Sequence, residues 1–166
     1  MSSSVLTSPL VELVASGGMT RPPMQPPSRQ PIGFWTVRAG EAVRARTRGA
    51  LGEIGMTQPE WWVLHQLSLH PEGVARSEVI ATVGPNDTPA AIESAIGSAI
   101  EKGWIRSEGA HLRSSEAGAA QFDRAAALQQ ALQEERMKGI SAEDFATTIV
   151  VLQKTIANVG GDAWHW

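Results

Sequence analysis

Histidines are the first side chains in this sequence to consider for metal binding or proton transfer. No two of them stand four residues apart, the spacing that places two ligands on one helix face; they are His65, His70, His111 and His165. The absence of cysteine excludes thiolate metal sites, disulfides and a cysteine nucleophile. The sequence also lacks a glycine-rich phosphate loop and a Gly-x-Ser-x-Gly nucleophile motif. We therefore expect no metal, no cofactor and no enzymatic activity.

Aromatic rings beside polar side chains form a second candidate group, because the chain has six tryptophans and no tyrosine. Arg38 follows Trp35 by about one helical turn and can pair with a ligand carboxylate. His65 follows Trp61 in the same way and can hydrogen-bond a hydroxyl. Trp62 lies about 100° further round the helix, so one ring can face the core and the other a ligand. The alternative is that these large apolar residues form ordinary core.

The charge balance limits the partners that the protein can hold. With a formal net charge of −3 and a pI of about 5.8, the chain has no overall basic field for nucleic acid. Any DNA contact must therefore come from a local patch. Arg44, Arg46 and Arg48 alternate and cannot share one helix face, so we expect them to be solvated or to form intersubunit ion pairs rather than to contact DNA.

The sequence shows no membrane signal. Its longest strongly apolar run, residues 149–152, is far shorter than the ~18 residues of a membrane span. Val5–Ala15 is mildly apolar, but no Lys or Arg precedes it, as one would in a secretory leader. We expect a cytoplasmic protein with no membrane partner.

Periodicity and capping signals predict a single, mostly α domain (α+β) over residues 32–160. It follows a flexible proline-rich tail, 1–31, and precedes a short tail, 161–166. Thr57 and Glu60 form a capping box, and Thr88 precedes Pro89 as the N-cap of a later helix. Helices are expected at about 33–52, 58–70, 76–83, 89–102, 116–137 and 141–159.

A hairpin pattern and an apolar seam refine this architecture. Residues 104–113 alternate about a Glu-Gly-Ala turn, which predicts a small β-hairpin. A helix, a short helix, a capped helix and a hairpin follow one another in a winged helix-turn-helix, whose recognition helix enters the DNA major groove. A second pattern, the apolar spacing 4, 3, 4, 3, predicts lengthwise packing on another helix; it comprises Phe145, Ile149, Leu152, Ile156 and Val159.

Three stretches resemble the multiple-antibiotic-resistance regulator (MarR) family of bacterial transcription factors. Residues 54–64 are similar to the family's Leu-Gly-Leu-Thr-x-x-Gln-Trp-x-Val-Leu segment. Residues 101–105 resemble Ala-Lys-Gly-Leu-Val, which closes the recognition helix, and 112–118 resemble the Leu-Thr-x-x-Gly that leaves the wing. Their order and spacing extend the resemblance over residues 32–159. It implies a homodimer built by helices at about 32–53 and 116–160, with a winged-helix lobe at about 57–115 on each subunit.

The resemblance also implies a function. Members of the family bind palindromic DNA, and small aromatic or phenolic effectors bind between the dimer helices and the lobe. It therefore predicts a ligand-responsive repressor whose effector site includes Trp35, Arg38, Trp62 and His65. The expected DNA-binding residues are Arg76, Thr88, Ala90, Ala91, Glu93, Ser94, Ser98, Arg106, His111 and Arg113.

The expected DNA-reading face departs from the family pattern. It carries no positive charge, and Glu93 would repel phosphates. The hairpin is short and lacks the family's Asp-x-Arg tip, which leaves Arg106 and Arg113 as its basic residues. An alternative function is therefore a winged-helix dimer that binds a small ligand or a protein partner, with weak or no DNA binding. We expect the terminal Trp164-His165-Trp166 to fold back on the dimer interface.

Overall fold

The structure is a computed structural model that describes residues 23–162. Residues 1–22 of the expected tail and the Trp164-His165-Trp166 end lie outside the described residues. The helices are α1 (Ile32–Glu53), α2 (Gln58–Leu69), α3 (Arg76–Val83), α4 (Pro89–Glu101), α5 (Glu116–Met137) and α6 (Ala142–Asn158). The strands are β1 (Val74–Ala75), β2 (Ile105–Glu108) and β3 (His111–Ser114), and short 3-10 turns form at Pro27–Arg29 and Gly84–Asn86.

Side-chain caps fix where the helices begin. The Thr57 side chain accepts a hydrogen bond from the Glu60 amide, and the Glu60 carboxylate accepts one from the Thr57 amide, which confirms the predicted capping box. The Thr88 hydroxyl accepts from the Ala91 amide ahead of Pro89 at the first turn of α4. Ser141 caps α6 in the same way, as predicted.

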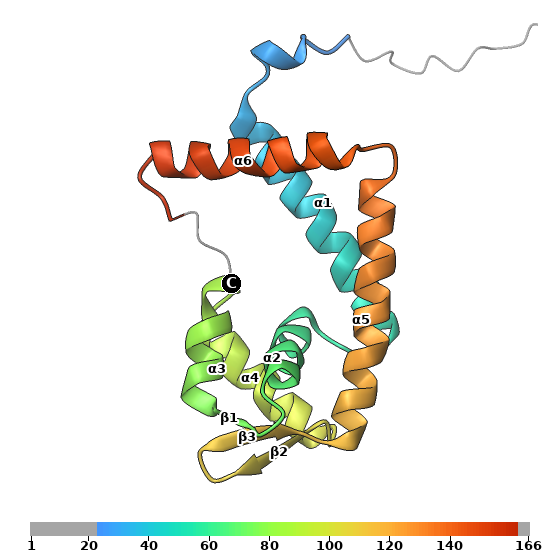
Figure 1. Cartoon of the computed structure of the whole chain (residues 1–166), viewed down its shortest axis with the longest axis vertical. Coiled ribbons are helices and arrows are strands. Elements are labelled where there is room, and N and C mark those ends of the chain that lie inside the picture. The colour runs from blue at the N-terminus through green and yellow to red at the C-terminus, as the bar shows by residue number, and fades with distance from the viewer. Residues whose placement is uncertain (1–22, 163–166) are drawn as a thin grey trace, which may run out of the picture.

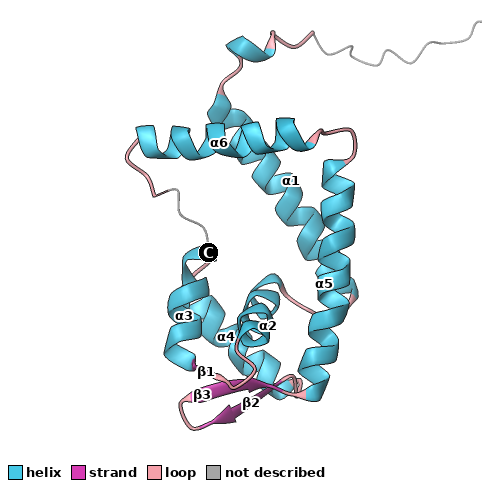
Figure 2. Ribbon diagram, in the orientation of Figure 1, coloured by secondary structure: helices cyan, strands magenta, loops and turns pink. Residues whose placement is uncertain are grey.

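A lobe forms where α2, α3 and α4 pack against the small sheet (Figure 1). Its core consists of apolar side chains that are almost fully buried, among them Leu64, Leu67, Val79, Ile92, Ile96 and Leu112. The sheet has the order β1-β3-β2 with antiparallel pairs, and Val74 of β1 lies opposite Leu112 of β3. Figure 2 shows the hairpin of β2 and β3 at the end of the lobe. The predicted mostly helical, winged-helix fold is confirmed.

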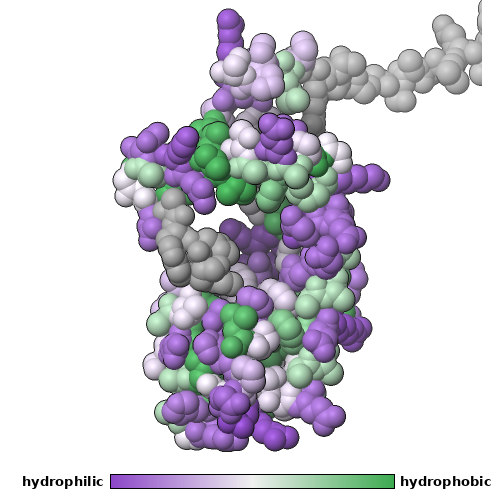
Figure 3. Space-filling model, viewed as in Figure 1, coloured by the Kyte–Doolittle hydropathy of each residue, from purple (hydrophilic) through white to green (hydrophobic). Residues whose placement is uncertain are grey.

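The long helices lie on one side of this lobe. α1 packs against α5, and a two-pronged ion pair joins Arg46 to Glu135 with an Nη2–Oε2 distance of 2.9 Å. α6 crosses the far end of both helices (Figure 1). No residue of α6 is buried within the single chain. Figure 3 shows apolar residues of this helix at the molecular surface.

The segment before α1 is partly ordered by α1 itself. The 3-10 turn at Pro27–Arg29 falls within the expected flexible tail, and Trp35 Nε1 donates to Gln30 Oε1 over 2.5 Å. Among the described residues, no helix combines the length and the apolar composition needed to span a membrane.

Candidate nucleic-acid interface

Helix α4 corresponds to the expected recognition helix. Its predicted DNA-binding residues point in two directions. Its apolar stripe, which includes Ile92 and Ile96, is buried in the lobe. Ala90 and Glu93 are exposed on its outer side. The remaining predicted residues, Ala91, Ser94 and Ser98, line an open groove of about 520 Å³ towards the end of α1 and the start of α2.

Glu93 is paired with Arg76, the first residue of α3. The Arg76 Nη2 atom lies 2.6 Å from Glu93 Oε1, and its Nε atom donates to both carboxylate oxygens over 2.9 and 3.1 Å. The sequence predicted both residues to face DNA, one as an attractive charge and the other as a repulsive one. The pairing cancels much of both effects, so Arg76 is a weaker phosphate ligand than its charge suggests.

The wing is the hairpin of β2 and β3, and it places two arginines opposite each other on adjacent strands. Arg106 on β2 and Arg113 on β3 are cross-strand partners, and both are exposed. Like charges in this position destabilise a sheet unless an anion compensates them. Arg113 Nη2 donates to the Glu72 carbonyl over 2.6 Å, which fixes its direction. His111, exposed at the start of β3, lies opposite Glu108. This arginine pair is the basic feature of the lobe best placed to bind a phosphate.

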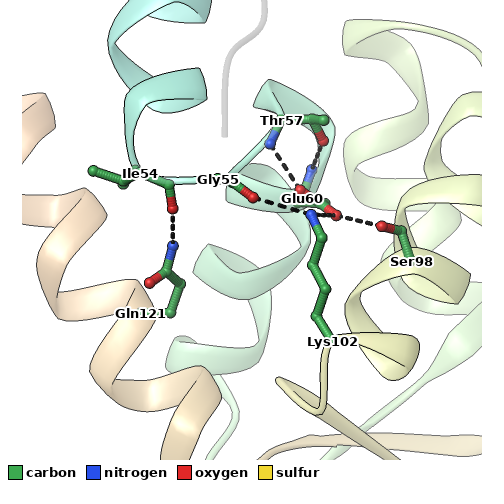
Figure 4. Close-up of polar contacts among 7 residues, drawn as sticks. All are labelled: Ile54, Gly55, Thr57, Glu60, Ser98, Lys102 and Gln121. Carbon is green, nitrogen blue, oxygen red and sulfur yellow. Dashed lines mark hydrogen bonds and ion pairs between the residues drawn. The ribbon is translucent and has the colours of Figure 1, made fainter.

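Glu60 is a buried carboxylate whose burial the sequence did not predict. It is 1% exposed and belongs to the capping box of α2. Figure 4 shows that Glu60 also reaches α4, since its Oε1 atom accepts from Ser98 Oγ over 2.7 Å and from Lys102 Nζ over 2.6 Å. Lys102 Nζ also donates to the Gly55 carbonyl and lies 4.6 Å from the centre of the Trp104 ring. The Ser98 hydroxyl is therefore directed towards α2, at the edge of the open groove.

The environment of Glu60 keeps its carboxylate charged. Burial, the largest influence, would raise the pKa of Glu60. The hydrogen bonds from Lys102, the Thr57 amide and Ser98, together with the Lys102 charge, outweigh burial, so the pKa of Glu60 is lowered overall. Among the described residues, no buried side-chain nitrogen or oxygen lacks a partner.

Comparison with known proteins identifies the fold. No family model and no curated protein matches the sequence. Among solved structures, CouR from Rhodococcus jostii RHA1, bound to p-coumaroyl-CoA, is 25% identical with a TM-score of 0.65, over 76% of this chain and 91% of that one. A MarR-family transcriptional regulator from Rhodococcus sp. RHA1 is also 25% identical, with a TM-score of 0.63 over 75% and 91% of the two chains.

The chain has the fold of MarR-family transcriptional regulators. A further relative, the MarR-family protein Rv2887 from Mycobacterium tuberculosis, was solved in complex with DNA. It is 24% identical with a TM-score of 0.62, over 76% of this chain and 98% of that one. These neighbours come from a family of transcriptional regulators.

The four residues expected to form a MarR effector site lie in three places. Trp35 and Arg38 line an exposed pocket of about 710 Å³ with Phe34 and the proline-rich segment before α1. His65 lies on α2 within an aromatic cluster, 5.7 Å from Trp61 and 6.1 Å from Phe122 between ring centres. Trp61 stacks on Phe122 of α5, so this cluster joins the lobe to the long helices. Burial lowers the pKa of His65, which favours its neutral form.

Trp62 lies at the junction that the MarR resemblance indicated. With Gln58 it lines a polar pocket of about 360 Å³ between the lobe and α1. Arg44 and Arg48 line this pocket from successive turns of α1, and Asp87 adds one carboxylate, so the arginines outnumber the acidic side chain. Sequence reasoning had assigned these two arginines to solvent or to intersubunit pairs. The available signal was their spacing of four residues, which excludes Arg46 from the shared face.

The residues predicted to form a MarR dimer interface lie on α6 and stay accessible in the single chain. Phe145, Ile149 and Ile156 are about 40% exposed and Val159 is 80% exposed, whereas Leu152 is half-buried. The first half of α1 adds more exposed apolar side chains, namely Ile32, Phe34, Trp35 and Val37. Such a contiguous apolar surface is typical of a protein interface.

Proposed function

We propose that this protein is a ligand-responsive, DNA-binding transcriptional regulator that acts as a homodimer on a palindromic operator. The observation that carries the proposal is the cross-strand pair of Arg106 and Arg113 in the wing, beside a helix-turn-helix built by α3 and α4. Two opposed guanidinium groups on an exposed hairpin suit a phosphate of the DNA backbone. The solved DNA complex of the mycobacterial relative supports this assignment.

The proposed interface depends weakly on charge. Because Glu93 occupies Arg76, two wing arginines remain as the main phosphate ligands of each lobe. A dimer would make only about four strong phosphate contacts, and salt would weaken its binding less than that of a strongly basic regulator. We expect Ala90 and the cap at Thr88 to approach the major groove, where small side chains allow close contact with base edges.

An acidic aromatic compound is the effector that best fits the proposal. The Trp62 ring offers a stacking surface, while Arg44 and Arg48 offer two guanidinium groups for a carboxylate or phosphate. Relatives with the same fold were solved with p-coumaroyl-CoA and with salicylic acid, both anionic aromatic compounds. Because the pocket lies between α1 and the lobe, a bound effector would bias the angle between them.

The proposed repression follows from that angle. In a homodimer joined through α1, α5 and α6, the two recognition helices must match half-sites about 34–36 Å apart. An effector that favours another lobe angle shifts the population away from this spacing and releases the DNA. The exposed apolar faces of α1 and α6 support the dimer.

Fluorescence anisotropy with duplexes tiled across the region upstream of the gene tests the proposal. We expect one duplex to bind tightly in low salt and to be released by salicylate or a similar aromatic acid. Arg113→Ala should weaken binding to all duplexes and reduce the salt slope by about one unit per subunit. Arg124→Ala is the matched control, because Arg124 is an exposed arginine of α5 away from the wing.

The same experiment tests a second function, that of a winged-helix dimer that binds a ligand or a protein but not DNA. One observation favours it: the outer face of α4 carries Glu93, and the nearest cation is committed to that carboxylate. If no duplex is preferred in low salt and Arg113→Ala changes nothing, the regulator proposal is wrong and the second function takes its place.

A further inference from the structure

The two oxygens of the Glu60 carboxylate serve different helices. Oε2 accepts from the Thr57 amide over 2.7 Å and completes the cap of α2. Oε1 binds Ser98 and Lys102, which lie four residues apart at the C-terminal end of α4. A capping box requires only the first of these contacts. The second set is an additional, buried connection between the start of α2 and the end of the recognition helix (Figure 4).

The partners of Lys102 make this connection directional. Its ammonium group lies between Glu60 Oε1 and the Gly55 carbonyl, and it also approaches the Trp104 ring. These groups come from the α1–α2 loop, from α2 and from the first residues after α4. Because hydrogen bonds require both distance and angle, the two bonds to Gly55 and Glu60, which lie outside α4, restrict rotation of α4 about its own axis.

Apolar packing alone holds this end of α4 less firmly. Towards this end α4 buries one large side chain, Ile96, and two small ones, Ala95 and Ala99, which fill little volume. Gly97 faces open space on another side of the helix, so it adds no side-chain contact that would hold α4. Small side chains allow a helix to slide or turn with little loss of contact. The hydrogen bonds from Ser98 and Lys102 to Glu60 therefore add a directional restraint on the rotation of α4.

We propose that Glu60 is a positioning residue for the recognition helix, whose buried carboxylate fixes the rotation of α4 through Ser98 and Lys102 and so determines how well the protein discriminates between DNA sequences. This inference rests on the proposed DNA-binding function. Glu60 itself does not touch DNA, because it is almost fully buried. Ser98 shares this role, because its hydroxyl donates to the Glu60 carboxylate.

The test compares Glu60→Gln with Glu78→Gln. Glutamine at position 60 keeps the capping box but removes the charge that holds Lys102. Glu78 is an exposed glutamate in the first turn of α3, so its replacement makes the same change of charge in the same lobe. Ser98→Ala and Lys102→Met provide milder variants if Glu60→Gln fails to fold.

The first measurement is amide hydrogen exchange in the DNA-free protein. We expect faster exchange along residues 89–101 in Glu60→Gln, Ser98→Ala and Lys102→Met, and unchanged exchange in α5. Combining Glu60→Gln with Lys102→Met should add little to either change, because both remove the same contact. Exchange in α4 that is the same in all variants as in Glu78→Gln would overturn the proposal.

The second measurement is the ratio of affinities for the preferred and for an unrelated duplex. We expect this ratio to fall by about ten-fold in Glu60→Gln, the discrimination of roughly one base contact, and to stay constant in Glu78→Gln. An equal loss on both duplexes would contradict a role in discrimination. If the wild-type protein binds no duplex, the proposed function fails, while faster exchange in α4 would still establish that Glu60 holds the helix.

Discussion

Glu93 is a negative charge on a helix proposed to read DNA, and its pairing with Arg76 gives it a definite role. The carboxylate draws the guanidinium group against the side of α4 and neutralises it there. Both side chains are partly solvated, so this pair contributes little to stability. The pair matters more for the proposed DNA binding, because Glu93 holds the Arg76 guanidinium group away from the phosphate backbone.

Glu93→Ala should therefore strengthen DNA binding. The change removes one repulsive charge and releases Arg76, so we expect about five-fold tighter binding and a steeper salt slope, by about one unit per subunit. Anisotropy titrations at several salt concentrations measure both quantities. Glu101→Ala is the control, since Glu101 is an exposed glutamate at the end of α4 whose removal releases no arginine. Equal gains in the two variants would contradict the role of Arg76.

Glu60 also predicts how the protein responds to acid. Its pKa in the folded state lies below the unfolded value of about 4.3, so the folded state favours the charged form. The contribution of Glu60 to stability is then complete above the unfolded pKa and is lost as the pH falls through the folded pKa. Because Lys102 is partly exposed, removing its partner costs about 2 kcal/mol, less than for a fully buried pair.

Urea unfolding of the wild type and of Glu60→Gln between pH 7 and pH 3 measures this effect. We expect the wild type to be more stable at pH 7 and the difference to shrink as the solution becomes more acidic than about pH 4. Glu78→Gln, which removes an exposed carboxylate, should show a small difference that hardly varies with pH. A constant gap between wild type and Glu60→Gln would mean that the carboxylate is not the stabilising form.

Sequence reasoning predicted part of these residue roles. The capping box at Thr57 was predictable because a cap depends on residues three positions apart. The burial of Glu60 was not, since it depends on Ser98 and Lys102, about forty residues away in the chain. Similarly, Arg76 and Glu93 were both proposed to face DNA, but their pairing depends on how α3 packs against α4.

At the scale of the elements, α6 is an apolar helix that the rest of the chain leaves largely uncovered. It has a continuous apolar seam, and yet none of its residues is buried in the single chain. A helix with this seam is stable when the seam is covered by another helix. The proposed homodimer supplies that cover from the partner's long helices.

Ile149→Asp tests the proposed dimer. A carboxylate in the middle of the seam would have to be buried without a partner, so we expect the variant to be monomeric, with a lower melting temperature. Size-exclusion chromatography with light scattering measures the mass. Leu69→Asp is the control, because Leu69 is an exposed leucine at the end of α2, outside the seam. An Ile149→Asp variant that remained dimeric would place the interface elsewhere.

Most elements could be predicted from the sequence because their signals are local. Helices at 76–83 and 116–137 were predicted with their observed bounds, from punctuation by glycine, proline and serine. β1 was not predicted. It has only two residues, too few for an alternating pattern, and it is a strand because Val74 and Ala75 pair with Leu112 and His111.

At the scale of the whole molecule, the lobe and the long helices meet through a few identifiable contacts. Gln121 Nε2 of α5 donates to the Ile54 carbonyl over 2.8 Å, and the Trp61–Phe122 stack lies beside it. The proposed effector pocket at Trp62 opens at the same junction. In the proposed homodimer, a ligand there would act on the connection between the long helices and the lobe without touching DNA. The Trp35 and Arg38 pocket lies too far along α1 to act on this junction directly.

The three-stranded sheet has a mechanical consequence. Because β1 joins the hairpin to the residue before α3, a force on the wing is transmitted directly into the helix-turn-helix. The Arg76 amide strengthens this link by donating to the Ala110 carbonyl at the hairpin turn over 2.9 Å. These contacts couple the hairpin to the start of α3, so we expect the wing and the helix-turn-helix to move together. A turn of the lobe about the start of α5 would then displace the hairpin tip, where Glu108 lies opposite His111, more than the arginine pair nearer the base.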